Sequence, residues 1–118
     1  MIHSYKISVT TTGSAGAATG SGSSTRPVNG RLLAVYIDYT SQPATADVTI
    51  TSTDPTQTLL TRSNSGTDGW FYPRVLLQDT AAANLTAVYD APPIDAYVSV
   101  SVAQGDAGSV DVTLLVEC

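Results

Sequence analysis

Short runs in which apolar residues alternate with serine or threonine recur along this chain. Three of them cover residues 5–10, 47–51 and 98–102. A period of two places every second side chain on the same face of a β-strand, so each run is expected to bury one face and expose the other. Because Gly, Pro and Asp separate the runs, the sequence predicts an all-β chain of strands joined by turns.

The run over residues 31–39 is mainly apolar on both faces, which predicts a central strand that is covered on both sides of the sheet or by an oligomer partner. Residues 95–103 and 109–117 flank a Gly-rich turn and predict a closing hairpin. Turn signals recur about every ten residues, which is typical of a β-sandwich or jelly-roll-like domain with about seven or eight antiparallel strands. We expect one such domain to span residues 1–118, a length that can bury its own core.

Residues 13–25 are built only from Gly, Ala, Ser and Thr. Since this segment lies between two strong strand patterns, we expect it to form a long loop or a slender β-arm. Small side chains let a backbone lie close against another surface. Such an arm is therefore suited to docking on a neighbouring molecule.

The densest apolar and aromatic cluster lies in residues 70–77. Pro73 lies within it and cannot donate to a strand ladder, which predicts an edge strand or an irregular segment. Trp70, Phe71 and Tyr72 are consecutive, so on a strand they point alternately to opposite faces. We expect at least one of them in the core and another at the surface.

The net charge is −5, with ten acidic residues against five Lys and Arg. A nucleic-acid site needs clustered basic side chains, and the basic residues here are scattered, so no nucleic-acid partner is expected. The same balance disfavours an anionic membrane surface, and no stretch has the roughly 20 apolar residues that span a bilayer. The first residues lack an apolar signal segment, which predicts a protein made in a cytoplasm and used or assembled there.

Side chains that carry chemistry are sparse. The only histidine, His3, lies in a segment expected to be mobile, and the only cysteine, Cys118, is the last residue. A catalytic nucleophile needs a positioned base, and one cysteine cannot build a thiolate-rich zinc site. The aspartates lie mostly in turns, where they hydrogen-bond their own backbone. The sequence therefore predicts a protein that is not an enzyme, with no catalytic residues, cofactor or metal site.

Five short segments, residues 11–20, 27–35, 37–39, 43–50 and 72–75, are spread over most of the chain. Their sequences resemble those of small virion structural proteins of tailed bacteriophages. The resemblance implies a capsid decoration, or cement, protein that forms a homotrimer and binds the major capsid protein on the outer face of the capsid lattice. It implies a place on the capsid surface of the virion after assembly in the host cytoplasm.

Two sets of residues are candidates for contacts with partners. The set expected to face the capsid comprises Gly13, Gly16, Gly20, Gly22 and Arg26. The set expected at an oligomer interface comprises Trp70, Phe71, Tyr72 and Arg74. Two other functions stay open: a neck, tail or baseplate component of the virion, and a carbohydrate-binding β-sandwich that stacks host glycans on Trp70 and Tyr72.

Overall fold

The computed structural model describes all residues 1–118 and consists of β-strands joined by turns. The strands are β1 (Ile2–Thr11), β2 (Ala18–Ser23), β3 (Val28–Asp38), β4 (Asp47–Ser52), β5 (Gln57–Arg62), β6 (Gly69–Phe71), β7 (Val75–Gln78), β8 (Asn84–Asp90), β9 (Pro93–Ala96), β10 (Val98–Gly105) and β11 (Gly108–Glu117). No helix of the length and hydropathy that a membrane span requires is present. The prediction of an all-β chain is confirmed.

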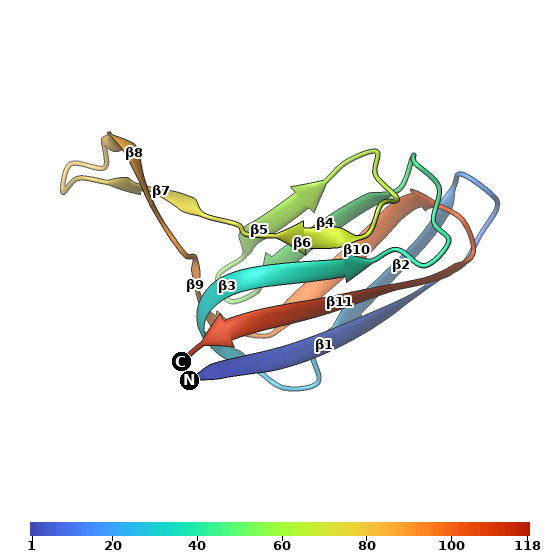
Figure 1. The fold of residues 1–118 in the computed structure, drawn as a ribbon, viewed down its shortest axis with the longest axis horizontal. Coiled ribbons are helices and arrows are strands. Elements are labelled where there is room, and N and C mark those ends of the chain that lie inside the picture. Colours follow the sequence, from blue (N-terminus) through green and yellow to red (C-terminus); the bar gives the residue numbers. More distant parts are fainter.

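The strands form three antiparallel sheets (Figure 1). A five-stranded sheet has the order β1-β11-β3-β6, with β9 also paired to β3, and a four-stranded sheet has the order β2-β10-β4-β5. These two sheets lie as two layers, an arrangement compatible with a β-sandwich. The third sheet is the hairpin β7-β8, which extends away from both layers (Figure 1).

The strand pairing is nested along the chain. The first strand pairs with the last, β2 pairs with β10, and β4 pairs with its neighbour β5. Between these pairs, β3 is joined along one side by both β6 and β9, at different positions along its length. The chain therefore folds like one long hairpin that wraps around a core. In this hairpin β6 and β9 both pair with β3, and the β7-β8 hairpin is inserted between them in the sequence.

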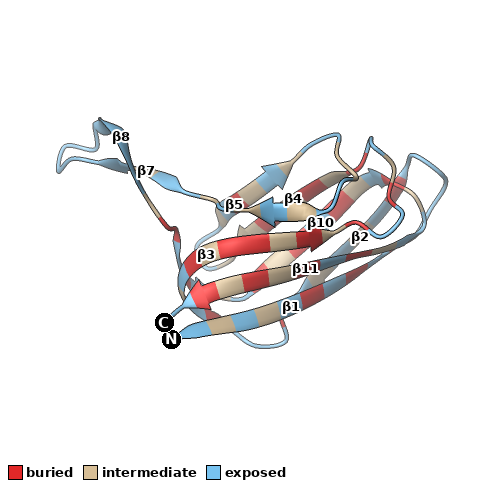
Figure 2. Ribbon diagram, viewed as in Figure 1, coloured by how far each residue is buried: buried red, intermediate tan, exposed pale blue.

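Buried side chains from the two layers meet in one hydrophobic core (Figure 2). Strand β10 is an example of the predicted alternation, because Val98, Val100 and Val102 are buried while Ser101 is exposed. Strands β4 and β11 alternate in the same way. The period-two pattern thus identifies the inward face of the long strands correctly.

Strand β3 is central in its sheet, as the apolar run predicted, with β11 on one side and β6 and β9 on the other. Its outer face carries Tyr36 and Asp38, which line an open groove, so no second layer of this chain covers that face. Strict alternation would place Leu33 on the same face as Val35. The register instead shifts opposite Leu115 and Val116, so Leu32 lies in the core and Leu33 is half-buried. A bulge of this kind inserts one residue and reverses the facing of the strand beyond it.

The structure corrects the prediction of a long loop or arm at residues 13–25. Only a short turn separates β1 from β2, and β2 is an edge strand paired with β10. A side chain at Gly22 would come within 2.8 Å of the Ser8 carbonyl oxygen, and one at Gly20 would meet the Thr10 carbonyl. The small residues therefore let β2 lie close to β1, where the two layers meet at one edge.

The predicted closing hairpin is also wrong, because β10 and β11 belong to different sheets. The buried side chain of Gln42 fills the corner between them. Its Nε2 donates to Thr11 Oγ1 at 3.2 Å and to the Asp106 carbonyl at 3.1 Å, and its Oε1 accepts from the Asp106 N–H at 2.9 Å. These hydrogen bonds satisfy the N–H and carbonyl groups of Asp106, where the chain crosses from one layer to the other.

Candidate functional site

The feature that departs most from a compact domain is the segment 75–90, which we call the arm. It consists of β7, a tight turn and β8, and it projects from one end of the molecule (Figure 1). At its tip Asp79 Oδ1 accepts hydrogen bonds from the N–H groups of Ala81 at 2.8 Å and Ala83 at 3.0 Å. This turn chemistry fixes the arm as a hairpin.

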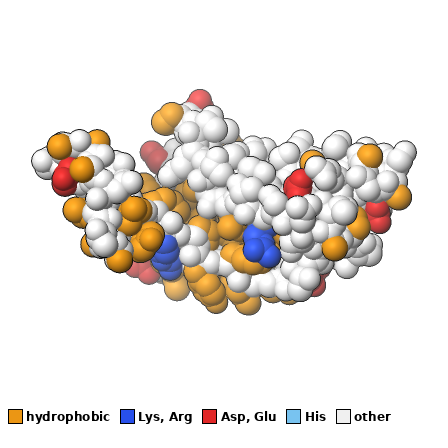
Figure 3. Space-filling view, turned by 90° about the horizontal axis from the view of Figure 1, so that it is seen from above, with side chains coloured by type: hydrophobic (Ala, Val, Ile, Leu, Met, Phe, Trp, Pro, Cys, Tyr) orange, Lys and Arg blue, Asp and Glu red, His pale blue; other side chains and the backbone are white.

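The arm exposes large apolar side chains along its length. Ten large hydrophobic residues of the chain are exposed, and seven of them lie between residues 70 and 89. These seven are Trp70, Tyr72, Val75, Leu77, Leu85, Val88 and Tyr89. Figure 3 shows hydrophobic side chains gathered over the arm and over the surface that joins it to the body. Concentrated exposed apolar surface of this kind marks an interaction site.

The base of the arm is attached firmly to β3. Arg74 Nη1 donates to the Leu33 carbonyl at 3.1 Å, and the Leu32 N–H donates to the Pro92 carbonyl at 3.0 Å. Pro92 itself is buried. The direction in which the arm leaves the body is therefore set by backbone contacts on both of its sides.

An ion pair between Arg31 and Asp90 closes the base. The Ala91 N–H donates to Asp90 Oδ1 at 2.7 Å. This hydrogen bond, helped by the charge of Arg31, lowers the pKa of the Asp90 carboxyl below its ordinary value. Because both partners of the ion pair are about half exposed, the pair orients the arm and contributes little to overall stability.

A two-stranded hairpin is at best marginally stable in water by itself. The arm has no third strand and no layer packed over it (Figure 2). Ten of its sixteen residues are apolar, and its only charged residues are Asp79 and Asp90. The arm therefore leaves most of its apolar side chains uncovered by its own chain.

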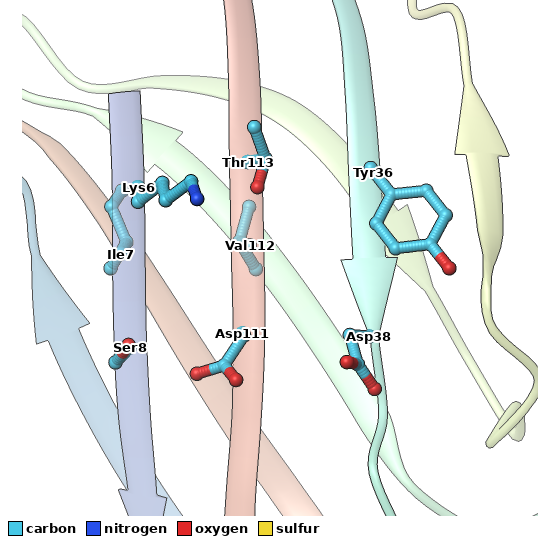
Figure 4. Close-up of a pocket in the computed structure, with 8 residues that line it drawn as sticks. All are labelled: Lys6, Ile7, Ser8, Tyr36, Asp38, Asp111, Val112 and Thr113. Carbon is cyan, nitrogen blue, oxygen red and sulfur yellow. The ribbon is translucent and has the colours of Figure 1, made fainter. Parts of the chain in front are cut away.

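A second surface feature is a groove on the outer face of the five-stranded sheet (Figure 4). It has a volume of about 280 Å³. Its lining residues are Lys6, Ile7, Ser8, Tyr36, Asp38, Asp111, Val112 and Thr113. The ring of Trp70 lies beside the groove, with its centroid 5.1 Å from that of Tyr36 and the two planes inclined by 57°. Polar and aromatic side chains therefore share this face.

The residues expected at an oligomer interface lie in and after β6. Phe71 faces inward against the core, and the Arg62 guanidinium lies 4.5 Å from its ring centroid. Trp70 and Tyr72 are 48% and 63% exposed. The prediction of an edge or irregular segment with one aromatic inside and another outside is confirmed, and Arg74 lies where the arm begins.

The residues expected to face a capsid do not form one site. Gly13 and Gly16 lie in the turn before β2, where the Gly16 N–H donates to Asp106 Oδ1 at 2.9 Å. Gly20 and Gly22 lie within β2. Arg26 follows the far end of that strand, with its guanidinium 4.8 Å from the ring centroid of Tyr5. The predicted set is therefore spread along the whole length of β2.

The prediction that His3 lies in a mobile terminus is wrong. His3 belongs to β1 and is paired with Val116 of β11. Cys118 is a free, exposed thiol. No group of three or more His, Cys, Asp or Glu side chains is placed to hold a metal ion.

The sequence prediction missed the arm, although prolines at positions 73, 92 and 93 bound it on both sides and mark it as a separate segment. No protein-family model, curated protein or solved structure matches this chain.

Proposed function

We propose that this protein is a capsid decoration, or cement, protein of a tailed bacteriophage, without enzymatic activity. It binds the major capsid protein on the outer face of the lattice and stabilises the shell against internal pressure. The observation that carries the proposal is the apolar arm, a segment whose exposed side chains need a partner surface. The resemblance of short sequence segments to phage virion proteins indicates that the partner surface belongs to a phage capsid.

The nested strand pairing supports a jelly roll as the finer description of the fold. In this reading β6 and β9 are two halves of one strand beside β3, and the arm is inserted between them. Eight strands then remain in two layers, which is the number that a jelly roll has. Jelly rolls are common in viral capsids and in lectins, so the fold agrees with the proposal without distinguishing it from a glycan-binding role.

We further propose that the arm joins copies of this chain into a homotrimer. Copies with a net charge of −5 repel one another. Within the arm Asp90 is paired with Arg31, which leaves Asp79 at the tip as the one uncompensated charge. The rest of the arm therefore offers an uncharged apolar contact. An arm that reaches from one copy to a different patch on the next makes a heterologous interface, which closes into a ring when the rotation allows it.

The turn with Gly13 and Gly16 lies at the end of the body opposite the arm (Figure 1). We keep this turn as the candidate capsid contact. Arg26 follows the opposite end of β2 and is not part of this surface. A trimer joined by its arms would present three such ends outward. Several modest contacts held in one assembly then act together, because the effective concentration of the second and third contacts is high once the first has formed.

The direct test is quantitative mass spectrometry of purified particles, giving copies of this chain per major capsid subunit. A ratio near one, or another simple large fraction, is expected for a protein spread over the lattice. A few copies per particle would replace the decoration role with a neck, tail or baseplate role. Absence from the particles would overturn both.

Substituting the arm tests the oligomer. Leu77→Ser combined with Val88→Ser removes two exposed apolar side chains, each contributing about 1.5–3 kcal/mol when fully buried in a contact. We expect native mass spectrometry to show at least a tenfold weaker association. Tyr97→Ser is the matched control, since Tyr97 is 47% exposed but lies on the body. An oligomer mass that the double variant leaves unchanged would contradict the assignment.

A further inference from the structure

We propose that the groove on the outer face of the five-stranded sheet, together with Trp70, binds a neutral hexose ring of a glycan. This role is separate from the arm and does not depend on the proposed place in a virion. Its basis is an aromatic platform that adjoins two rows of polar side chains with unused hydrogen-bonding capacity.

The first row crosses four strands. Lys6 is paired with Thr113, Thr113 with Tyr36, and Tyr36 with Trp70, so the four side chains share the outer face. Adjacent strands lie about 4.8 Å apart, which makes the row about 14 Å long. That length accommodates one or two sugar rings, with the aromatic pair at one end and the ammonium group at the other.

The second row lies two residues further along the same strands. Ser8 is paired with Asp111, and Asp111 with Asp38. Figure 4 shows the carboxylates of Asp38 and Asp111 turned away from each other on this face. Like charges placed directly opposite each other destabilise a sheet. A break of a local rule of this kind is often found where a surface has a function.

The polar groups of the groove are almost unused within the chain. Asp38 Oδ1 accepts one hydrogen bond, from the Thr40 N–H at 2.9 Å. The side chains of Lys6, Ser8, Asp111 and Thr113 make no hydrogen bond with the rest of the protein, and the same holds for the Tyr36 hydroxyl. The groove can therefore offer carboxylate acceptors and hydroxyl and ammonium donors to a ligand.

A pyranose ring has the complementary chemistry. Its apolar face of C–H groups suits an exposed indole, while its rim of hydroxyl groups can donate to carboxylates and accept from hydroxyl and ammonium groups. With Lys6 against Asp38 and Asp111 the groove has a net charge of −1. The groove should therefore take neutral sugars and reject sialylated or phosphorylated ones.

Trp70 is the only tryptophan of the chain, so its fluorescence reports on the platform directly. The probes are methyl β-galactopyranoside, methyl β-glucopyranoside and N-acetylglucosamine, titrated into the full chain, with galactose 6-phosphate as the anionic comparison. We expect a saturable change with at least one neutral probe at millimolar concentration, and none with galactose 6-phosphate. No saturable change with any neutral probe up to about a hundred millimolar would overturn the proposal.

Asp111→Asn separates a binding role from a merely structural one. It removes the like-charge pair, so it should raise the urea midpoint of unfolding while weakening sugar binding at least tenfold. Tyr89→Ala in the arm is the control and should leave sugar binding unchanged. A stabilised Asp111→Asn variant with unaltered sugar binding would overturn the proposal, as would chelator-reversible binding of Ca²⁺ in place of the sugars.

Discussion

Individual glycines and one glutamine define how the two layers join. Gly20 and Gly22 let β2 approach β1 more closely than any side chain would allow, and Gln42 supplies the hydrogen bonds at the β10–β11 corner. The two glycines act through backbone carbonyls of β1, and Gln42 acts through the backbone of Asp106 and the hydroxyl of Thr11. Their replacement should therefore change stability through steric overlap or unsatisfied hydrogen bonds, with little change in buried apolar area.

Gly20→Ala should destabilise the fold by about 1–3 kcal/mol, because the added methyl group has no room beside the Thr10 carbonyl. Gly69→Ala is the control, since a methyl group there would meet only Phe71 Cζ at 3.6 Å. Urea unfolding followed by Trp70 fluorescence measures both. Equal midpoints for the two variants would show that β1 and β2 do not pack as described.

Gln42→Ala leaves the Asp106 N–H without a partner, although Thr11 Oγ1 still donates to the Asp106 carbonyl, and should cost about 1–3 kcal/mol. Gln78→Ala also removes a glutamine hydrogen bond, to Asn84, but in the exposed arm. We expect this control to stay within about 0.5 kcal/mol of the parent protein. Thermal unfolding of the two variants gives the comparison, and a Gln42→Ala protein as stable as the parent would refute the role of the corner.

At the scale of elements, the alternation of apolar and polar residues identified the long strands β1, β3, β4, β10 and β11. It missed β2, because a strand of glycine, serine and threonine has no apolar face to reveal it. It also missed which sheet each strand joins. The hairpin predicted for β10 and β11 fails because a turn pattern does not say whether the chain returns beside itself or crosses to the other layer.

The arm was missed for a related physical reason. Residues such as Leu77 and Val88 read as ordinary strand residues, and sequence alone does not say whether an apolar side chain is covered by its own core or by another molecule. The groove was missed because its lining residues come from three strands, β1, β3 and β11. Only the register brings Lys6, Asp38 and Asp111 to the same face.

The base of the arm should respond to acid. Since folding lowers the pKa of Asp90, the contribution of this carboxylate is present above its ordinary pKa and is lost as the pH falls through the lowered value. Hydrogen exchange at the Ala91 N–H should therefore become less protected at acidic pH and stay constant near neutrality. Asp90→Asn should remove this pH dependence, whereas a pH dependence that survives in the variant would assign it to another group.

At the scale of the whole molecule, the arm makes the chain more extended than a compact domain. The radius of gyration is 14.9 Å, whereas a compact domain of this length has about 13.5 Å. Every core residue except Tyr39, which directly follows β3, lies in a strand of the two larger sheets, and no core residue comes from the arm. The two larger sheets therefore stabilise the fold, and the arm extends beyond them to where it can contact another molecule.

Replacing residues 75–90 with a short Gly-Ser turn should leave a folded body. The reason is that β6 and β9 are each paired with β3 independently of the arm. We expect the melting temperature to change by only a few degrees and the radius of gyration from small-angle scattering to fall, with loss of the oligomer. A body that does not fold would show that the arm supports the core.

The interruption of the β6–β9 segment has a consequence for how such a protein can diversify. Because both halves are anchored on β3, the segment between them can change in length and composition while the core stays as it is. Residues 79–83 at the tip could change during evolution or be replaced by a foreign peptide. Either change would alter the binding partner without altering the fold. The two-layered body then stays the same while the arm, residues 75–90, varies from one protein to another.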